Sequence, residues 1–114
     1  MRAPIALLSM LLVTLLGAGI VSAQLPADAV WIDVRSPAEY ETGHLAQARL
    51  IPFDGIETGV HGLKLAKDTP IYLYCAVGGR AEVAKQRLEA LDYSNVTNVG
   101  SLENARKLAG ETAP

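Results

Sequence analysis

Cysteine is scarce in this chain, since Cys75 is the only one among 114 residues. A lone cysteine has no partner for an intrachain disulfide, so the fold lacks the crosslink that small secreted domains often use. The thiol is therefore either a buried packing residue or a group kept for its chemistry.

Positive charge is also in short supply. Charged residues make up 19% of the chain, and the formal net charge is −2. Nucleic-acid-binding domains present clusters of lysine and arginine, so we expect no nucleic-acid partner. His44, His61 and Cys75 show no recurring ligand spacing, and we expect neither a metal nor another cofactor.

No charged residue lies between Arg2 and Asp28. The apolar centre at Ile5–Leu16, followed by small residues up to Ala23, predicts a signal peptide over residues 1–23 with cleavage after Ala23. The mature protein would then be periplasmic or secreted, without a stable membrane anchor. The alternative is an uncleaved anchor, because about twenty uncharged residues could just span a bilayer. The short apolar centre favours cleavage.

The remaining length suits one domain. We expect a linker at residues 24–29, a domain at residues 30–109 and a tail at residues 110–114 that frays. Apolar, β-branched runs predict four strands: Val30–Val34, Ala48–Pro52, Pro70–Tyr74 and Asn95–Gly100. Helical patterns separate these runs, so we predict an α/β fold with a mostly parallel central sheet of about four to five short strands flanked by helices.

Three segments outside the strands have helical signals. The run Ser36–Glu39 has a capping-box pattern, which predicts a short helix ending near Thr42. A second helix is predicted by an apolar stripe after the third strand, formed by Ala81, Ala84, Leu88 and Leu91. A third helix is predicted at Leu102–Leu108. The segment Asp54–Leu65 contains three glycines and is expected to be a loop with at most one helical turn.

Cys75 follows the third strand and precedes a helix, at the edge where parallel α/β sheets form binding sites. Gly78 and Gly79 let the backbone curl so that successive amides converge, and the first-turn amides of the helix add their dipole. Such amides would hold the sulfur as thiolate, the reactive form. Arg80 opposes the helix dipole, which a bound anion would explain. Taken alone, these residues are equally compatible with an inert packing cysteine and a solvated Arg80.

The segment Cys75–Arg80 reads C-x-x-G-x-R and follows an apolar strand. Upstream, Asp33–Pro52 reads DVRSPAEYETGHLAQARLIP, and downstream Leu91–Ser101 reads LDYSNVTNVGS. These segments, in this order and spacing, resemble the active-site loop and the flanking signatures of the rhodanese family of sulfurtransferases. The resemblance covers nearly the whole chain after residue 23 and implies a single rhodanese-like domain.

The resemblance implies that Cys75 takes sulfane sulfur from thiosulfate, holds it as a persulfide and passes it to cyanide or a thiol. The residues that would cradle the persulfide and orient the donor are Ala76, Val77, Gly78, Gly79 and Arg80. Asp33 and Arg35 border the same edge of the sheet. We expect them to have a supporting, structural role, with Arg35 paired to Glu39 or Glu41.

Some positions depart from the family pattern. Ala76 stands where many members carry arginine, so we expect weak thiosulfate binding. Gln47, Arg49, Leu50 and Ser101 also differ, near the second strand and at the far rim of the expected pocket. Related phosphatases of this fold have five residues between cysteine and arginine, whereas this loop has four. The shorter loop disfavours phosphatase activity.

The residues leave two other functions open. A non-catalytic module would carry the persulfide for a partner or dock through the loop. A redox protein would form mixed disulfides at Cys75, although no resolving cysteine is present. We expect a monomer or a weak dimer, and a covalent dimer through Cys75 is compatible with an oxidising compartment.

Overall fold

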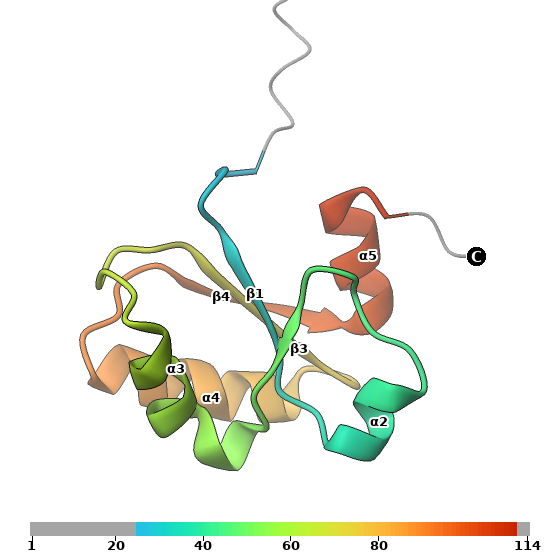
Figure 1. The fold of residues 1–114 in the computed structure, drawn as a ribbon, viewed down its shortest axis with the longest axis horizontal. Coiled ribbons are helices and arrows are strands. Elements are labelled where there is room, and N and C mark those ends of the chain that lie inside the picture. Colours follow the sequence, from blue (N-terminus) through green and yellow to red (C-terminus); the bar gives the residue numbers. More distant parts are fainter. Residues whose placement is uncertain (1–24, 112–114) are drawn as a thin grey trace, which may run out of the picture.

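The computed structural model describes residues 25–111. Four parallel strands form one sheet in the order β2-β1-β3-β4 (Figure 1). The strands are β1 (Val30–Asp33), β2 (Arg49–Leu50), β3 (Ile71–Cys75) and β4 (Val96–Ser101). The helices are α2 (Pro37–Glu41), the 3-10 helix η2 (Phe53–Gly55), α3 (Ile56–Leu63), α4 (Gly79–Ala90) and α5 (Leu102–Ala109). The predicted α/β domain with about four to five mostly parallel strands is confirmed, and the four strands lie where the sequence predicts them.

The predicted signal peptide at residues 1–23 lies outside the described residues, as do residues 112–114. None of the helices in residues 25–111 has the length and hydrophobicity that a membrane span requires. The expected linker forms a turn, in which the Ala29 amide donates to the Pro26 carbonyl over 3.2 Å.

The first two residues of the expected tail, Gly110 and Glu111, make contacts with the domain in the structure. Gly110 adopts φ +77° and caps α5. The Glu111 carboxylate accepts hydrogen bonds from Arg106 Nε at 3.1 Å and from the Ala46 amide at 3.0 Å. These contacts tie the chain after α5 to the loop before β2.

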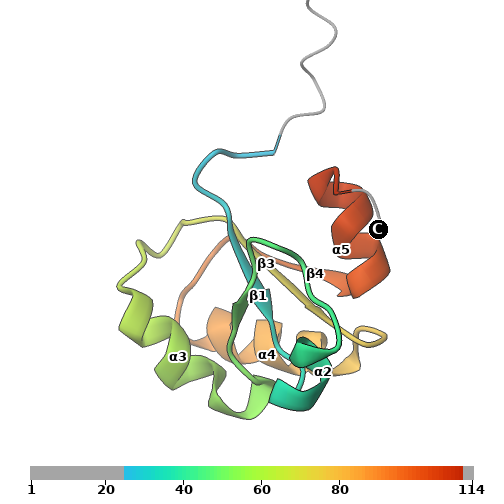
Figure 2. The same cartoon turned by 45° about the vertical axis from the view of Figure 1, so that its right-hand side comes forward.

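Helices cover both faces of the sheet. α3 and α4 lie together on one face, and α5 lies on the other (Figure 2). β3 is an inner strand, and Ile71, Leu73, Tyr74 and Cys75 in it are at most 1% exposed. The prediction that the third strand is covered on both faces is therefore confirmed.

The capping box at the start of α2 is confirmed. The Glu39 amide donates to Ser36 Oγ at 3.2 Å, and the Ser36 amide donates back to Glu39 Oε1 at 3.0 Å. Pro37 is the first helical residue, and Thr42 caps the other end. The box fixes the direction in which the chain leaves β1, and it places the Glu39 side chain at the carboxyl edge of the sheet.

The prediction for Asp54–Leu65 is wrong, because α3 runs for two turns. Ile56 and Val60 are one helical turn apart and fully buried. Burial of these two side chains contributes roughly 3–6 kcal/mol, which outweighs a cost of roughly 2 kcal/mol for the two glycines inside the helix. Gly59 also permits close packing, since a Cβ there would lie 2.3 Å from Ile51 Cγ2.

α4 begins at Gly79, two residues before the predicted start. Three residues of the predicted stripe, Ala81, Ala84 and Leu88, are fully buried. The fourth is wrong, because Leu91 caps the helix and is 41% exposed. The backbone leaves helical geometry at that residue and carries the side chain away from the core.

Candidate active site

Cys75 is the last residue of β3, and its sulfur accepts two backbone hydrogen bonds. The Gly78 amide donates to Cys75 Sγ at 3.0 Å, and the Ala81 amide donates at 3.4 Å. The first amide comes from the loop and the second from the first turn of α4. Both N–H groups stabilise negative charge on the sulfur, as does the positive end of the α4 dipole.

The tight loop depends on Gly78, which has φ +105° and caps α4. Residues with a Cβ rarely adopt this conformation, whereas glycine does so at no steric cost. The Gly78 backbone turns the chain from β3 into α4 within three residues of Cys75. This turn brings the Gly78 N–H toward the sulfur rather than toward solvent.

The outer part of the loop is exposed and uncharged. Ala76 and Val77 form its tip, and Val77 is 88% exposed. Cys75, in contrast, is 1% exposed, so its sulfur lies at the bottom of the loop. A slender reactant with a terminal sulfur fits such access better than a bulky one.

Arg80 forms an ion pair with Glu39 rather than standing free. Nη1 and Nη2 of Arg80 donate to the two carboxylate oxygens of Glu39 at 2.8 and 3.0 Å. The hydrogen bond from Arg80, with a second from the Ser36 amide, lowers the pKa of Glu39 from 4.5 to about 2. The anion that the sequence predicts opposite Arg80 is therefore a carboxylate of the chain itself.

The expected pairing of Arg35 with Glu39 or Glu41 is wrong. Arg35 Nη2 donates to Asp33 Oδ2 at 2.6 Å, and Nε donates to Asp33 Oδ1 at 2.9 Å. The Arg35 amide also donates to Asp33 Oδ1, so a local turn holds the two side chains together. The hydrogen bonds with Asp33 raise the pKa of Arg35.

The Asp33–Arg35 pair fixes the loop after α2. Asp33 is fully buried, and Arg35 Nη2 also donates to the Gly43 carbonyl at 2.7 Å. The guanidinium lies 5.6 Å from the centre of the Tyr74 ring. Burial raises the pKa of Tyr74, whose hydroxyl oxygen accepts from the Leu45 amide. This geometry supports a structural role for both Asp33 and Arg35.

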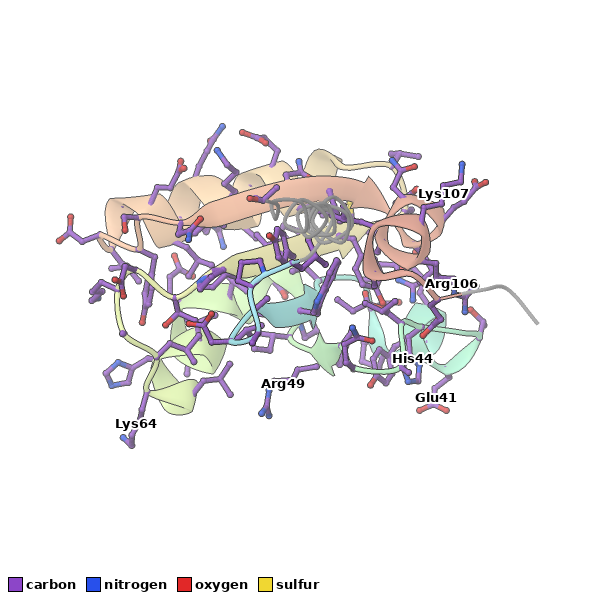
Figure 3. All side chains as sticks on the ribbon, turned by 90° about the horizontal axis from the view of Figure 1, so that it is seen from above. Glu41, His44, Arg49, Lys64, Arg106 and Lys107 are labelled. Carbon is purple, nitrogen blue, oxygen red and sulfur yellow. The ribbon has the colours of Figure 1, made fainter. Side chains whose placement is uncertain are left out.

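A cavity of about 330 Å³ lies beside the loop at the carboxyl edge of the sheet. Its walls come from Val34–Pro37 after β1, Pro52–Asp54 after β2, and Arg80 of α4. Both arginines in these walls are paired with carboxylates, and Asp54 adds a negative charge. Figure 3 shows two other cations, Arg49 and Lys64, pointing outward from the domain. The cavity walls therefore present no uncompensated positive charge.

The two histidines make contacts elsewhere in the domain and not with the Cys75 thiol. His44 stacks on Tyr40 with ring centres 3.6 Å apart, and its Nδ1 lies 2.9 Å from the Tyr40 carbonyl oxygen. His61 lies in α3. Among residues 25–111, no three histidine, cysteine, aspartate or glutamate side chains gather as metal ligands.

The structure adds residues to the site that the sequence does not single out. Ala81 gives an amide to the sulfur, Glu39 holds Arg80, and Asn98 of β4 donates to the Gly78 carbonyl at 3.0 Å. The sequence could have indicated the Ala81 amide, because a helix predicted to start after Cys75 directs its first-turn N–H groups toward the loop. No sequence signal pairs Glu39 with Arg80, which lies 41 residues later.

Comparisons with known proteins agree with this geometry. The model of the rhodanese-like domain matches residues 18–106. The thiosulfate sulfurtransferase PspE of Escherichia coli K12 is 31% identical over 74 residues, which cover 65% of this chain and 71% of that protein. The tRNA uridine(34) hydroxylase of Erwinia tasmaniensis is 34% identical over 93 residues, but the match covers 76% of this chain and only 27% of that protein.

Solved structures show the same fold. A rhodanese with anions from E. coli superposes with a TM-score of 0.64 at 30% identity, covering 67% of this chain and 89% of that one. A rhodanese-like domain protein from Staphylococcus aureus gives a TM-score of 0.60 at 26% identity, covering 82% of this chain and 83% of the other. The chain therefore belongs to the rhodanese-like domain family, the sulfurtransferase family whose motifs it carries.

Proposed function

We propose that this chain transfers sulfane sulfur from thiosulfate to cyanide or a thiol through a persulfide on Cys75. The observation that carries the proposal is the position of the sulfur, which lies at the bottom of a loop with two amides directed toward it. The similarity to a thiosulfate sulfurtransferase over 71% of that enzyme's length supports the choice of donor.

The reaction has two displacement steps. The Cys75 thiolate attacks the outer sulfur of thiosulfate, a new S–S bond forms, and the old one breaks as sulfite leaves with the electron pair. Cyanide then attacks the outer sulfur of the persulfide, giving thiocyanate and regenerating the thiolate. No proton is transferred in either step, and ping-pong kinetics follow.

The amides of Gly78 and Ala81 stabilise the anionic sulfur in this cycle, before and after it takes up a second sulfur atom. Arg80 has a positioning role beside the donor-orienting role that the family resemblance implies. Because Glu39 holds its guanidinium in two hydrogen bonds, Arg80 shapes the loop and the cavity wall.

A second candidate is a persulfide carrier that passes sulfur to a partner but turns over thiosulfate slowly. The paired arginines favour this reading, because a dianionic donor meets no uncompensated cation in the cavity walls. Turnover with cyanide separates the two functions, since a carrier accumulates persulfide without producing thiocyanate at a useful rate.

Cys75→Ser tests the proposal. Thiosulfate should add the mass of one sulfur atom to the intact wild-type protein, and the adduct must lie on the only cysteine of the chain. The Cys75→Ser variant should gain no mass and lose thiocyanate production by about a thousandfold or more. Equal thermal unfolding of both proteins is the control. Thiocyanate production by the variant at the wild-type rate would contradict the proposal.

A further inference from the structure

Asn98 joins β4 to the loop around Cys75. Its Nδ2 donates to the Gly78 carbonyl at 3.0 Å and to Glu82 Oε1 at 3.1 Å. Its Oδ1 accepts from the Gly100 amide at 3.0 Å. The side-chain amide therefore connects an edge strand, the turn after Cys75 and the first turn of α4.

A β-bulge directs Asn98 toward the loop. In the pairing of β3 with β4, Leu73 lies opposite Asn98 but Tyr74 lies opposite Gly100, so Val99 is an extra residue. Bulges change the direction of the side chains beside them. The hydrogen bond from the Gly100 amide to Asn98 Oδ1 closes this bulge and fixes the orientation of the side chain.

The carbonyl that Asn98 holds belongs to the residue that also gives its N–H to the sulfur. The Gly78 carbonyl accepts from Asn98 and from the Glu82 amide, and these bonds fix the peptide plane after Gly78. The plane before Gly78 carries the N–H that lies 3.0 Å from Cys75 Sγ. Because glycine allows a wide range of φ and ψ, the plane before Gly78 keeps its N–H on the sulfur more readily when the plane after it is anchored.

We propose that Asn98 is a positioning residue for sulfur transfer, which acts by holding Gly78 so that its N–H points at the sulfur of Cys75. The inference rests on the proposed function for its kinetic effect. Asn98 does not touch the reacting sulfur; it acts through the Gly78 backbone. A hydrogen bond of this kind changes rates by about fivefold to tenfold when it is removed.

Two substitutions remove the bonds of Asn98, and a third gives a matched control. Asn98→Ala removes all of them, and Asn98→Leu removes them while keeping an uncharged side chain of similar size. Asn95→Ala is the control, because Asn95 also donates to a backbone carbonyl, that of Asp68 at 3.4 Å, before the same strand. Glu82→Ala tests whether Asn98 acts through α4 instead.

The first readout is the rate of persulfide formation from thiosulfate. We expect a fivefold to tenfold loss in both Asn98 variants and wild-type rates in Asn95→Ala and Glu82→Ala. The second readout is the pH profile of Cys75 alkylation by iodoacetamide, which reports the thiolate directly. Its midpoint should move to higher pH in both Asn98 variants and stay in place in Asn95→Ala. Circular dichroism checks that each variant is folded.

Asn98 variants that match Asn95→Ala in both readouts would overturn the inference. So would a rate loss with an unchanged alkylation profile, because a purely structural defect would explain it. A wild-type protein that forms no persulfide would refute the proposed function instead, and the alkylation profiles would still test how Asn98 acts on Gly78.

Discussion

Ala76 is the residue next to the nucleophile, and its side chain is exposed at the tip of the loop. The resemblance to the rhodanese family implies an arginine at this position in many members. Arg35 and Arg80, which line the cavity, are both paired with carboxylates, so a cation at position 76 would add an uncompensated positive charge to the loop after Cys75. The residue at this position therefore changes the charge of the loop that follows the nucleophile.

Ala76→Lys should lower the KM for thiosulfate by about fivefold, since one charge near a protein surface contributes about 1 kcal/mol to binding a dianion. Steady-state kinetics at fixed cyanide concentration measure the change, and the gain should shrink as salt is added. Ala76→Gln is the control, because it adds a side chain of similar length without charge. Equal KM values for the two variants would show that charge at the loop tip does not limit binding.

Two helices that are far apart in the chain meet through one ion pair. Glu39 belongs to α2 and Arg80 to α4, and their side chains join the two elements across the carboxyl edge of the sheet. Glu39 serves two purposes at once, because the same carboxylate caps α2 through the Ser36 amide. The capping box orients the carboxylate, and the oriented carboxylate then holds the start of α4.

The ion pair predicts a dependence of stability on pH. The pKa of Glu39 is lowered from 4.5 to about 2, so the pair stabilises the fold above pH 4.5 and this contribution is lost as the pH falls from 4.5 toward 2. Glu39→Gln keeps a capping-box acceptor but removes the charge. Thermal unfolding should show the variant less stable than wild type at neutral pH, with a difference that shrinks below pH 4.5. A difference that stays constant down to pH 2 would contradict the ion pair. The absolute effect should be small, because both side chains are partly exposed.

At the scale of the whole molecule, the sequence predicts the strand order along the chain, the α2 capping box and the loop between β3 and α4. These features depend on neighbouring residues or on burial patterns that repeat along one element. The sequence does not predict α3, because Gly59 reads as a helix breaker until its packing against Ile51 is seen. The sequence also does not predict the hydrogen bonds of Glu39 with Arg80 and of Asn98 with Gly78. These partners are 41 and 20 residues apart, so no local pattern marks them.

The whole fold also bears on whether two copies can join through their cysteines. A disulfide needs the Cα atoms of its two residues within about 4.4–6.8 Å of each other. Cys75 is 1% exposed at the end of an inner strand, and Ala76 and Val77 lie outside it. Two folded copies therefore cannot bring their sulfurs together. The same burial disfavours mixed disulfides with other folded proteins, and so it disfavours the redox function that the sequence leaves open.

We expect the wild-type protein to remain free of covalent dimers after treatment with a thiol oxidant, as judged by non-reducing gel electrophoresis. A double variant, Cys75→Ser with Val77→Cys, moves the only cysteine to a position whose side chain is 88% exposed in the native protein. This variant should form dimers readily under the same conditions, because its thiol lies at the surface of the loop. If the wild type formed dimers as fast as the variant, the loop would have to open far enough to expose Cys75, and the thiol would be accessible to large partners as well as to small sulfur donors.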